Sequence, residues 1–438
     1  MRGTKSGSGS FLRVRLLIVA FSVSATLAAG QTFNVINAFT GATGAKVLAG
    51  LIFDGNGNLY GTTAEGGLGN GTVFELSPAT GGGWSETVLY NFGGTIYDGS
   101  NPQSGLVFDG AGNLYGTTMN GGRYNRGTIF ELSPVSGGGW TETVLHSFGY
   151  GHDGTFPMAA LAIDAAGNLY GTTYNGGAVL TCMASGIAYS CGTVFELSPA
   201  GVGKWTYAVI HNFRGGTVDG NFPVAGVTLD ASGNLFGETA YGSAYGGGLL
   251  FELLPLGGGK WQEKIVHPWG RIHDGRLDGT YPYGTLVFDA AGNFYGTATI
   301  GGIHGGLGMV FKFVPNATNT GWVEQSIHGF GNGTDGQTPL AGVVVDSAGN
   351  VYGTTNNGGT YGEGIIYELI PGSTGYFYKV LHNFNGTTDG GWAAAPLVMD
   401  NAGHLYGTTE YGGLTTSCTT FPLAGCGVVF VLSLPCAH

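Results

Sequence analysis

The decapeptide DGAGNLYGTT, from Asp109 to Thr118, recurs in close copies along the chain of 438 residues. The shared pattern D-x-x-G-[NH]-[LFV]-[YF]-G begins at seven aspartates: Asp54, Asp109, Asp164, Asp230, Asp289, Asp346 and Asp400. Its first four residues suit a turn, because Asp in first place accepts a backbone hydrogen bond and Gly in fourth place adopts a positive φ. We therefore interpret the motif as the connection between two strands and not as an active-site sequence.

Two further patterns complete the repeat. Sequences like GTVFELSP begin at seven glycines: Gly71, Gly127, Gly192, Gly248, Gly308, Gly364 and Gly427. Sequences like TETVLHSF end at six aromatic residues: Phe92, Phe148, Phe213, Trp269, Phe330 and Phe384. The seventh copy of the last pattern lies at the other end of the chain, in TFNVINAF from Thr32 to Phe39. The start of the chain thus supplies the strand that the last repeat lacks.

Each repeat predicts four short strands, which we call a, b, c and d in chain order. In the second repeat they are SGLVFD, NLYGTT, GTIFELS and TETVLHSF, all rich in strand-forming residues and bounded by turn residues. Seven such units predict an all-β, seven-bladed β-propeller over residues 31–438, formed as one domain. The N-terminal strand joins the last blade and closes the ring. A solenoid would need atypical repeats at its ends, and the sequence contains none.

The first thirty residues have a different composition. Four basic residues precede an apolar run over residues 16–29, and small residues follow. This pattern predicts a Sec-type secretory signal peptide over residues 1–30, with an uncleaved N-terminal anchor as the alternative. Removing the four basic residues takes the net charge from −12 to about −16. A protein with this much negative charge repels phosphate backbones and anionic lipids. We therefore expect no nucleic-acid partner.

The connected pattern GNLYGTT…NGG…GTVFELSP resembles the GloVer-type tandem-repeat proteins, a family of exported bacterial repeat proteins. The resemblance covers nearly all of the chain after the leader. It implies export and a repeat fold, and it implies no established activity, so it transfers no catalytic residues. Many members carry a C-terminal sorting anchor, whereas this sequence ends in LSLPCAH without an apolar tail. We expect a secreted or periplasmic monomer that has no membrane span.

In this strand order the b–c and d–a loops share one face of the ring, and function is most often found on such variable loops. Six d–a loops contain Asp-Gly, with the aspartates Asp98, Asp153, Asp219, Asp278, Asp335 and Asp389. A ring of these carboxylates at the channel mouth predicts a site for Ca²⁺ or for a cationic or sugar ligand. The alternative is an Asx-type turn in each loop. The seventh loop, TGATGAK, lacks the aspartate.

Departures from the repeat are further candidates. The longest d–a connection, WGRIHDGRLDGTYP, holds Arg271, His273 and Arg276, which could bind an anionic group or act in acid–base chemistry. The alternative is a solvated polar loop. Glu238 stands in strand b where threonine is usual.

Histidines and glutamates also recur at equivalent positions. Strand d carries His146, His211, His267, His328 and His382, and strand c carries Glu75, Glu131, Glu196, Glu252 and Glu368. The ring spreads the histidines too far apart to share one metal ion, so we interpret them as structural. We expect the glutamates to contact neighbouring strands.

The cysteines fall mainly in two b–c loops. Cys182 and Cys191 share one loop, and Cys418 and Cys426 share another, which predicts two local disulfides in an exported protein. We do not expect a single Cys₄ zinc site, because the two loops belong to blades on opposite sides of the ring. Cys436 remains, and we expect a free or intermolecular thiol.

No G-x-S-x-G, H-E-x-x-H or Walker sequence occurs in the chain. The sequence therefore predicts an exported, non-catalytic binding scaffold for an extracellular polysaccharide or protein, with the b–c/d–a face as its binding surface. No cofactor is expected other than Ca²⁺. The alternatives are an extracellular lyase or hydrolase working at the channel mouth, and a structural envelope protein.

Overall fold

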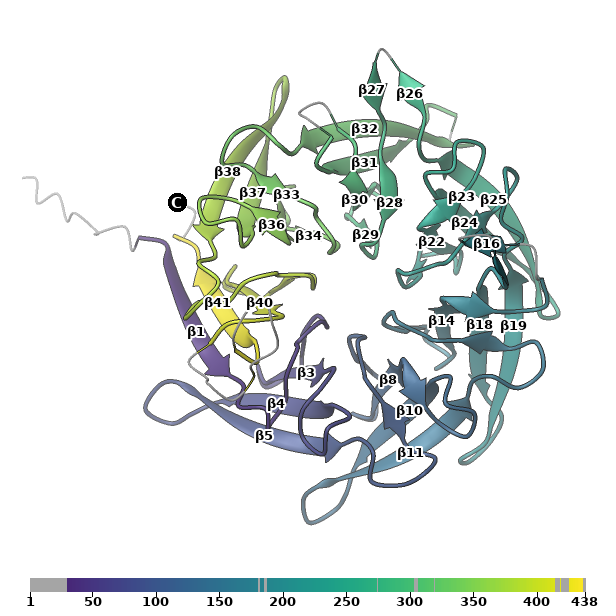
Figure 1. Cartoon of the computed structure of the whole chain (residues 1–438), viewed down its shortest axis with the longest axis vertical. Helices are drawn as coiled ribbons and strands as arrows, with labels where there is room; N and C mark the ends of the chain where they lie inside the picture. The colour runs from purple at the N-terminus through teal and green to yellow at the C-terminus, as the bar shows by residue number, and fades with distance from the viewer. Residues whose placement is uncertain are drawn as a thin grey trace, which may run out of the picture.

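Seven antiparallel sheets, six of four strands and one of five, form a ring in the computed structural model (Figure 1). The structure describes residues 30–179, 182–184, 187–273, 275–302, 306–318, 320–413, 418 and 425–435. The predicted leader (residues 1–29) and Cys436 lie outside these residues. The predicted seven-bladed propeller is confirmed. The described residues contain no helix long and apolar enough to cross a membrane.

The strand bounds follow the repeat. The a strands are β2 (Ile52–Phe53), β7 (Val107–Phe108), β13 (Ala162–Ile163), β21 (Thr228–Leu229), β29 (Val287–Phe288), β34 (Val344–Val345) and β39 (Val398–Met399). The b strands are β3 (Leu59–Thr63), β8 (Leu114–Thr118), β14 (Leu169–Thr173), β22 (Leu235–Thr239), β30 (Phe294–Ile300), β35 (Val351–Thr355) and β40 (Leu405–Thr409). The c strands are β4 (Thr72–Pro78), β10 (Thr128–Pro134), β18 (Thr193–Pro199), β24 (Leu249–Gly257), β31 (Met309–Pro315), β37 (Ile365–Gly372) and β41 (Val428–Ser433). The d strands are β5 (Trp84–Asn91), β11 (Trp140–Ser147), β19 (Trp205–Asn212), β25 (Lys260–Pro268), β32 (Trp322–Gly329), β38 (Gly375–Asn383) and β1 (Thr32–Ala38).

The d–a and b–c loops meet on one face, as the strand order requires. Short two-stranded pairings join them: β6 (Gly99–Ser100) with β9 (Asn120–Gly121), β12 (Gly154–Thr155) with β15 (Asn175–Gly176), β20 (Gly220–Asn221) with β23 (Tyr241–Gly242), and β33 (Gly336–Gln337) with β36 (Asn357–Gly358). In the fifth blade the d–a loop pairs directly with strand b through β28 (Thr280–Pro282). We call this side of the ring the loop face.

The motif that begins at Asp109 forms a hydrogen-bonded turn. Asp109 Oδ1 accepts hydrogen bonds from the backbone N–H groups of Ala111 and Asn113, at 2.8 and 2.9 Å. Its Oδ2 accepts from the Asn113 side chain at 2.8 Å and from the Tyr115 hydroxyl at 3.1 Å. Burial raises the pKa of Asp109, but these hydrogen bonds outweigh it and hold the pKa below its usual value. The aspartate therefore fixes both the turn and the tyrosine of the following strand.

The glycine of LYGTT makes room for an aromatic ring. A Cβ on Gly116 would lie 2.6 Å from Cζ of Phe130, because the ring of strand c crosses directly over strand b. Phe130 in turn contacts Phe92 of the preceding blade, with ring centroids 5.1 Å apart. Equivalent pairs join all seven blades: Phe39–Phe74, Phe92–Phe130, Phe148–Phe195, Phe213–Phe251, Trp269–Phe311, Phe330–Tyr367 and Phe384–Phe430. These buried pairs form the core between the blades.

A β-bulge interrupts the pairing of strands c and d. In the second blade the partners shift between Ile129 and Phe130, which leaves Leu145 without a partner in the register. The same shift occurs in the other blades. A bulge of this kind bends the strand and redirects its side chains. It lies just before the seventh residue of strand d, His146 in β11.

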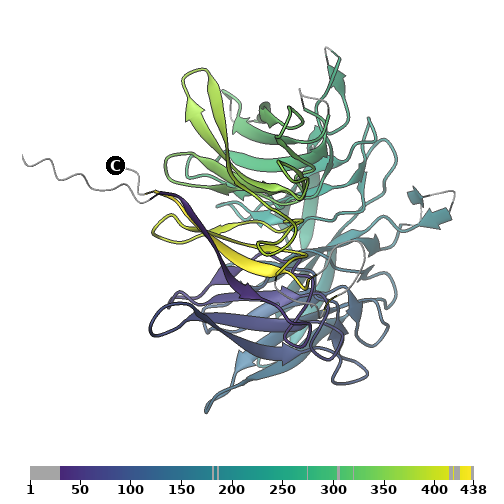
Figure 2. The ribbon, with the colours of Figure 1, turned by 60° about the vertical axis from the view of Figure 1, so that its left-hand side comes forward.

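The ring closes where the two ends of the chain meet. β1 pairs antiparallel with β41, and the two strands run side by side in both views of the ribbon (Figures 1 and 2). Thr408 donates its hydroxyl to the Ala49 carbonyl at 3.1 Å, which joins the last blade to the first. The predicted closure by the N-terminal strand is confirmed.

Candidate functional site: the loop face and the central cavity

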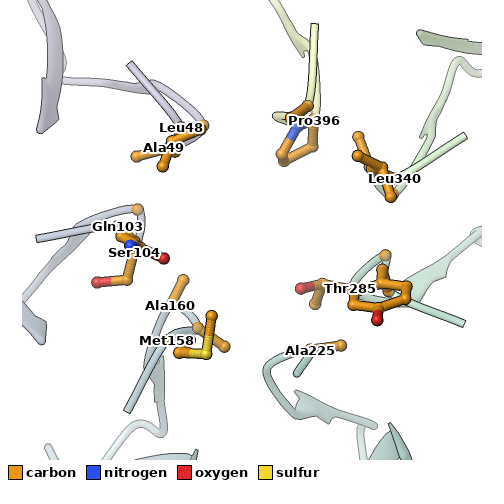
Figure 3. A pocket seen from close by; sticks show the side chains of 18 of the residues that line it. Leu48, Ala49, Gln103, Ser104, Met158, Ala160, Ala225, Thr285, Leu340 and Pro396 are labelled. Atoms are coloured by element: carbon orange, nitrogen blue, oxygen red, sulfur yellow. The ribbon is translucent and has the colours of Figure 1, made fainter. Parts of the chain in front are cut away.

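A cavity of about 480 Å³ lies at the centre of the ring, lined by the segments that lead into the a strands (Figure 3). All seven blades contribute, with side chains that include Leu48, Gln103, Met158, Val224, Tyr283, Leu340 and Ala394. Among the described residues that line it there is no Asp, Glu, His, Lys or Arg. The cavity is therefore an apolar pocket with a few uncharged polar groups, a composition typical of ligand sites.

The residue that introduces each of these segments has an unusual backbone conformation. Seven equivalent non-glycine residues have φ between 55° and 59°: Lys46, Asn101, Phe156, Phe222, Tyr281, Thr338 and Trp392. The left-handed region costs a non-glycine residue about 1–3 kcal/mol and is enriched at functional sites. Hydrogen bonds hold it here: the N–H of Tyr281 donates to Gly247, and that of Phe222 to Cys191. Four of the seven side chains are aromatic, so the ring of blades presents a varied, aromatic-rich set beside the cavity.

Aromatic residues connect these positions to the cavity. Tyr174 stacks on Phe222 with centroids 4.9 Å apart, and Tyr241 contacts both Phe222 and Tyr281, at 5.9 and 4.9 Å. Burial, and then the neighbouring tyrosines, raise the pKa of Tyr283 in the cavity wall to about 12. Its hydroxyl therefore remains a neutral hydrogen-bond donor at physiological pH. We call Tyr174, Phe222, Tyr241, Tyr281 and Tyr283 the aromatic cluster.

The loop face also carries the exposed tyrosines. Those of the described residues that expose a third or more of their surface are Tyr97, Tyr124, Tyr150, Tyr241, Tyr245 and Tyr361, and all lie in b–c or d–a loops. A second cavity, of about 530 Å³, opens between loops of the second and third blades and is lined by Arg126, His152, Asp153 and Phe156, among others. Both cavities and these tyrosines thus belong to one face.

The six loop aspartates are used within their own loops, and none of them lines the central cavity. Asp98 is typical: its Oδ2 accepts hydrogen bonds from the N–H groups of Gly93 and Gly94, at 2.7 and 2.9 Å, and from the Tyr90 hydroxyl at 3.0 Å. Asp153, Asp219, Asp278, Asp335 and Asp389 likewise accept backbone hydrogen bonds near their own positions. This geometry is that of a turn in each loop, and ligand binding at these carboxylates stays a prediction.

The sequence did not reveal that each recurring histidine faces the aspartate of the loop that follows it. His146 Nε2 lies 3.0 Å from Asp153 Oδ2, and the same pairs form at His328 with Asp335, 3.2 Å, and at His382 with Asp389, 3.0 Å. The spacing of seven residues in these three pairs is visible in the sequence, whereas it is eight from His211 to Asp219 and eleven from His267 to Asp278. The bulge that brings them together is not.

A third residue joins each pair from the next blade. It is the residue of strand d equivalent to Glu142 of β11, and around the ring it is Glu86, Glu142, Tyr207, Glu263, Glu324, Tyr378 or Phe33. We call the residue of a d strand equivalent to His146, the following loop aspartate and this third residue a junction cluster. Where the third residue is aromatic its ring stacks on the histidine, as Tyr207 does on His146 with centroids 4.0 Å apart. Where it is glutamate, a carboxyl group enters the cluster instead.

One junction cluster predicts a specific pH dependence. Burial, and then the charge of Asp98, raise the pKa of Glu142 to about 7 from an ordinary value near 4.5. The folded protein therefore keeps a proton that the unfolded chain releases, so this group lowers stability as pH rises from about 4.5 to 7. We expect Glu142→Gln to match wild type at pH 4.5 and to be more stable by up to about 3 kcal/mol at pH 8. Denaturant unfolding at both pH values measures this, and an equal difference at both would contradict it.

The remaining predicted site residues lie elsewhere. Arg271, His273 and Arg276 are exposed on a hairpin of β26 (Ile272–His273) and β27 (Arg276–Leu277) that extends outside the ring of blades (Figure 1). They do not line the central cavity. The recurring glutamates contact neighbouring strands as expected: Glu131 accepts from Tyr115 at 2.9 Å.

Both predicted disulfides are present. Cys182 is bonded to Cys191, and Cys418 to Cys426, each across a Cα–Cα distance of 5.3 Å within one b–c loop. Disulfides are typical of extracellular and periplasmic proteins.

The solved structures that this chain resembles are distant from it. A solved protein of unknown function from Dyadobacter fermentans is 10% identical, with a TM-score of 0.46 over 93% of this chain and all of that one. PorZ of Porphyromonas gingivalis, a surface component of the type-IX secretion system, is 14% identical, with a TM-score of 0.44 over 81% of this chain and 44% of that one. No curated protein sequence matches.

The repeat unit identifies the family. The Gloeobacter/Verrucomicrobia repeat matches residues 19–183, 180–325 and 308–433, which together span almost the whole propeller. The predicted resemblance to GloVer-type repeat proteins is thereby confirmed, and the chain belongs to the Gloeobacter/Verrucomicrobia repeat family.

Proposed function

We propose that the protein is an exported binding protein that holds an extracellular polysaccharide on the loop face, over the aromatic cluster and the central cavity. The observation that carries the proposal is the distribution of aromatic side chains. The exposed tyrosines described above belong to the loop face, and rigid aromatic rings with a polar edge bind ligands at low entropic cost. The two disulfides support the exported location.

Binding is favoured over catalysis at the cavity because its described lining contains no group that can exchange a proton near neutral pH. Glycosidic chemistry needs two carboxyl groups on either side of the scissile bond. The lining instead offers apolar side chains and the hydroxyl of Tyr283, which suit the faces and hydroxyl groups of sugars. A polymer is favoured over a small sugar because the aromatic residues continue from the cavity onto the exposed loops.

We expect a protein of residues 31–438 to bind purified polysaccharides on a glycan array. The variants Tyr241→Ala and Tyr281→Ala should bind the same polysaccharides more weakly. Truncating an aromatic residue at the centre of an interface costs more than about 1 kcal/mol, so each variant should lose about tenfold in affinity. Phe377→Ala is the matched control, because Phe377 is an exposed aromatic residue on the outer strand β38.

Three outcomes would contradict the proposal. No polysaccharide binds, the three variants bind alike, or incubation releases new reducing ends, which would establish the hydrolase instead.

A further inference from the structure

Two of the junction clusters combine histidine, aspartate and glutamate. One consists of His211, Asp219 and Glu263, and the other of His267, Asp278 and Glu324. In each cluster one ligand atom per residue lies within 4.8 Å of the others. The imidazole and the loop carboxylate come from one blade and the glutamate from the next. The clusters lie at neighbouring junctions of the ring, third to fourth and fourth to fifth blade.

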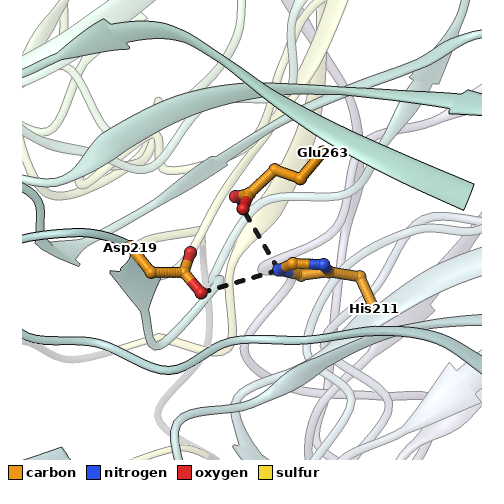
Figure 4. A group of neighbouring side chains, drawn as sticks. All are labelled: His211, Asp219 and Glu263. Atoms are coloured by element: carbon orange, nitrogen blue, oxygen red, sulfur yellow. Dashed lines mark ion pairs between the residues drawn. The ribbon is translucent and has the colours of Figure 1, made fainter.

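The histidine in these clusters lacks the hydrogen bond that its counterparts make. His211 Nε2 lies 3.8 Å from Asp219 Oδ2 and 3.7 Å from Glu263 Oε1 (Figure 4). Both distances exceed that of a hydrogen bond. His211 Nε2 and Glu263 Oε1 are fully buried, and neither has a hydrogen-bond partner. Unpaired buried polar atoms are costly, so their position calls for an explanation.

The other histidine clusters provide an internal comparison. Where an aromatic residue replaces the glutamate, the histidine lies 3.0–3.2 Å from its aspartate and makes the hydrogen bond. With glutamate in that place, the distance from histidine to aspartate is 3.8 Å at His211 and 3.3 Å at His267, and the Nε2 atom of each histidine has no hydrogen-bond partner. The nitrogen and the two carboxylate oxygens thus surround a common point in place of forming one pair.

We propose that these two clusters bind divalent transition-metal ions such as Zn²⁺, with one imidazole nitrogen and two carboxylate oxygens as ligands. Zinc binds histidine nitrogen and carboxylate oxygen at about 2.0–2.2 Å, which places two tetrahedral ligands about 3.4 Å apart. The distances of 3.7 and 3.8 Å around His211 are close to that separation. Three protein ligands leave a fourth position for water.

The surrounding groups are compatible with this donor set. The N–H groups of Arg214 and Gly220 donate to Asp219 at 2.8 and 2.6 Å and orient its carboxylate, which has lone pairs left for a metal. The Arg214 side chain lies 3.4 Å from Asp219 Oδ2, the oxygen that faces His211, and would compete with a metal ion for it. In the other cluster no arginine pairs with Asp278 among the described contacts, and the Gly270 N–H binds its Oδ1 at 3.0 Å. We therefore expect the His267 cluster to bind more tightly.

The test is titration of chelator-treated residues 31–438 with Zn²⁺ by calorimetry, at pH 7.5 and micromolar protein. We expect two equivalents for wild type, one for Glu263→Gln, one for Glu324→Gln and none for the double variant. Glu142→Gln is the matched control, because its cluster has Tyr90 in place of histidine, and it should keep two equivalents. Thermal unfolding of each variant without metal shows that the fold is intact.

Cobalt provides an independent readout, since Co²⁺ in a four-coordinate site absorbs in the visible range and loosely bound surface Co²⁺ absorbs weakly. Two results would overturn the proposal. One is a zinc stoichiometry that the glutamate substitutions leave unchanged. The other is the absence of micromolar binding to wild type, which would make each cluster a set of polar contacts among its three side chains and not a metal site.

Discussion

Deleting residues 31–39 is expected to abolish the cooperative unfolding transition of the propeller. The deletion removes β1, whose six paired residues form the outer strand of the last blade, and leaves β41 as an open edge. It also removes Phe39, which is fully buried against Phe74 of the first blade with ring centroids 5.0 Å apart. Loss of one buried phenylalanine alone costs about 3–5 kcal/mol, a large part of the stability of a typical domain. Circular dichroism during heating measures the transition.

A synthetic peptide of residues 30–40 should restore the transition, because an added strand can pair with an open sheet edge. Phe39→Ala in the full chain should lower stability by about 3–5 kcal/mol. Val35→Ser serves as the control within the same strand, since Val35 is exposed and its loss should change little. A truncated chain that unfolds at the wild-type temperature would show that ring closure contributes nothing.

The sequence predicted the fold because the residues that define each blade act within short segments of the chain. The turn at Asp109, the glycine at Gly116 and the aromatic residue at Phe130 each recur once in every blade. Counting the outer strands located the missing copy at Thr32–Phe39, and this determined how the ring closes. The disulfides were predictable for a related reason, because both cysteines of each pair lie in a single loop.

The sites were less predictable, because they depend on contacts between blades. The bulge before His146 redirects this side chain of strand d, and no spacing rule shows which residue of the next blade it meets. The six recurring loop aspartates led to the prediction of a ligand site at the channel mouth, but their hydrogen bonds to the preceding loop and strand d depend on the fold and could not be read from the recurrence. The positive φ at residues such as Tyr281 also escaped notice, because those positions vary in sequence and usually precede proline, where extended backbone is expected.

Trp269→Ala is expected to be the most destabilising single substitution in the fourth blade. Trp269 is fully buried, contacts Phe311 with centroids 4.7 Å apart, and donates its indole N–H to Glu238 Oε1 at 3.2 Å. Removing the ring costs about 3–5 kcal/mol, and leaving a buried carboxyl group without its donor adds about 1–3 kcal/mol. Urea unfolding monitored by circular dichroism measures the loss.

Glu238 and Trp269 both differ from the residues at the equivalent positions of the other blades. The other blades have threonine at the position of Glu238, and phenylalanine at that of Trp269. Trp269→Phe should therefore destabilise by about 1–3 kcal/mol through the lost hydrogen bond, and adding Glu238→Thr should recover most of that loss. Additive effects in this double-mutant cycle would mean that the two residues act independently.

The buried carboxyl group of Glu238 makes the stability of this pair depend on pH, which apolar packing alone would not do. Burial raises the pKa of Glu238 well above its ordinary value, although the hydrogen bond from Trp269 lowers it. Between the ordinary pKa of a glutamate and this raised value, the folded protein holds a proton that the unfolded chain releases, so this group lowers stability as pH rises through that range. Glu238→Gln keeps an acceptor for the indole and cannot ionise. Its stability should equal that of wild type near pH 4.5 and exceed it increasingly at higher pH, by up to about 1.4 kcal/mol per pH unit until Glu238 ionises in the folded state. A constant difference between pH 5 and pH 8 would show that Glu238 is charged in the folded protein, and then the indole would bind a buried carboxylate and not a neutral acid.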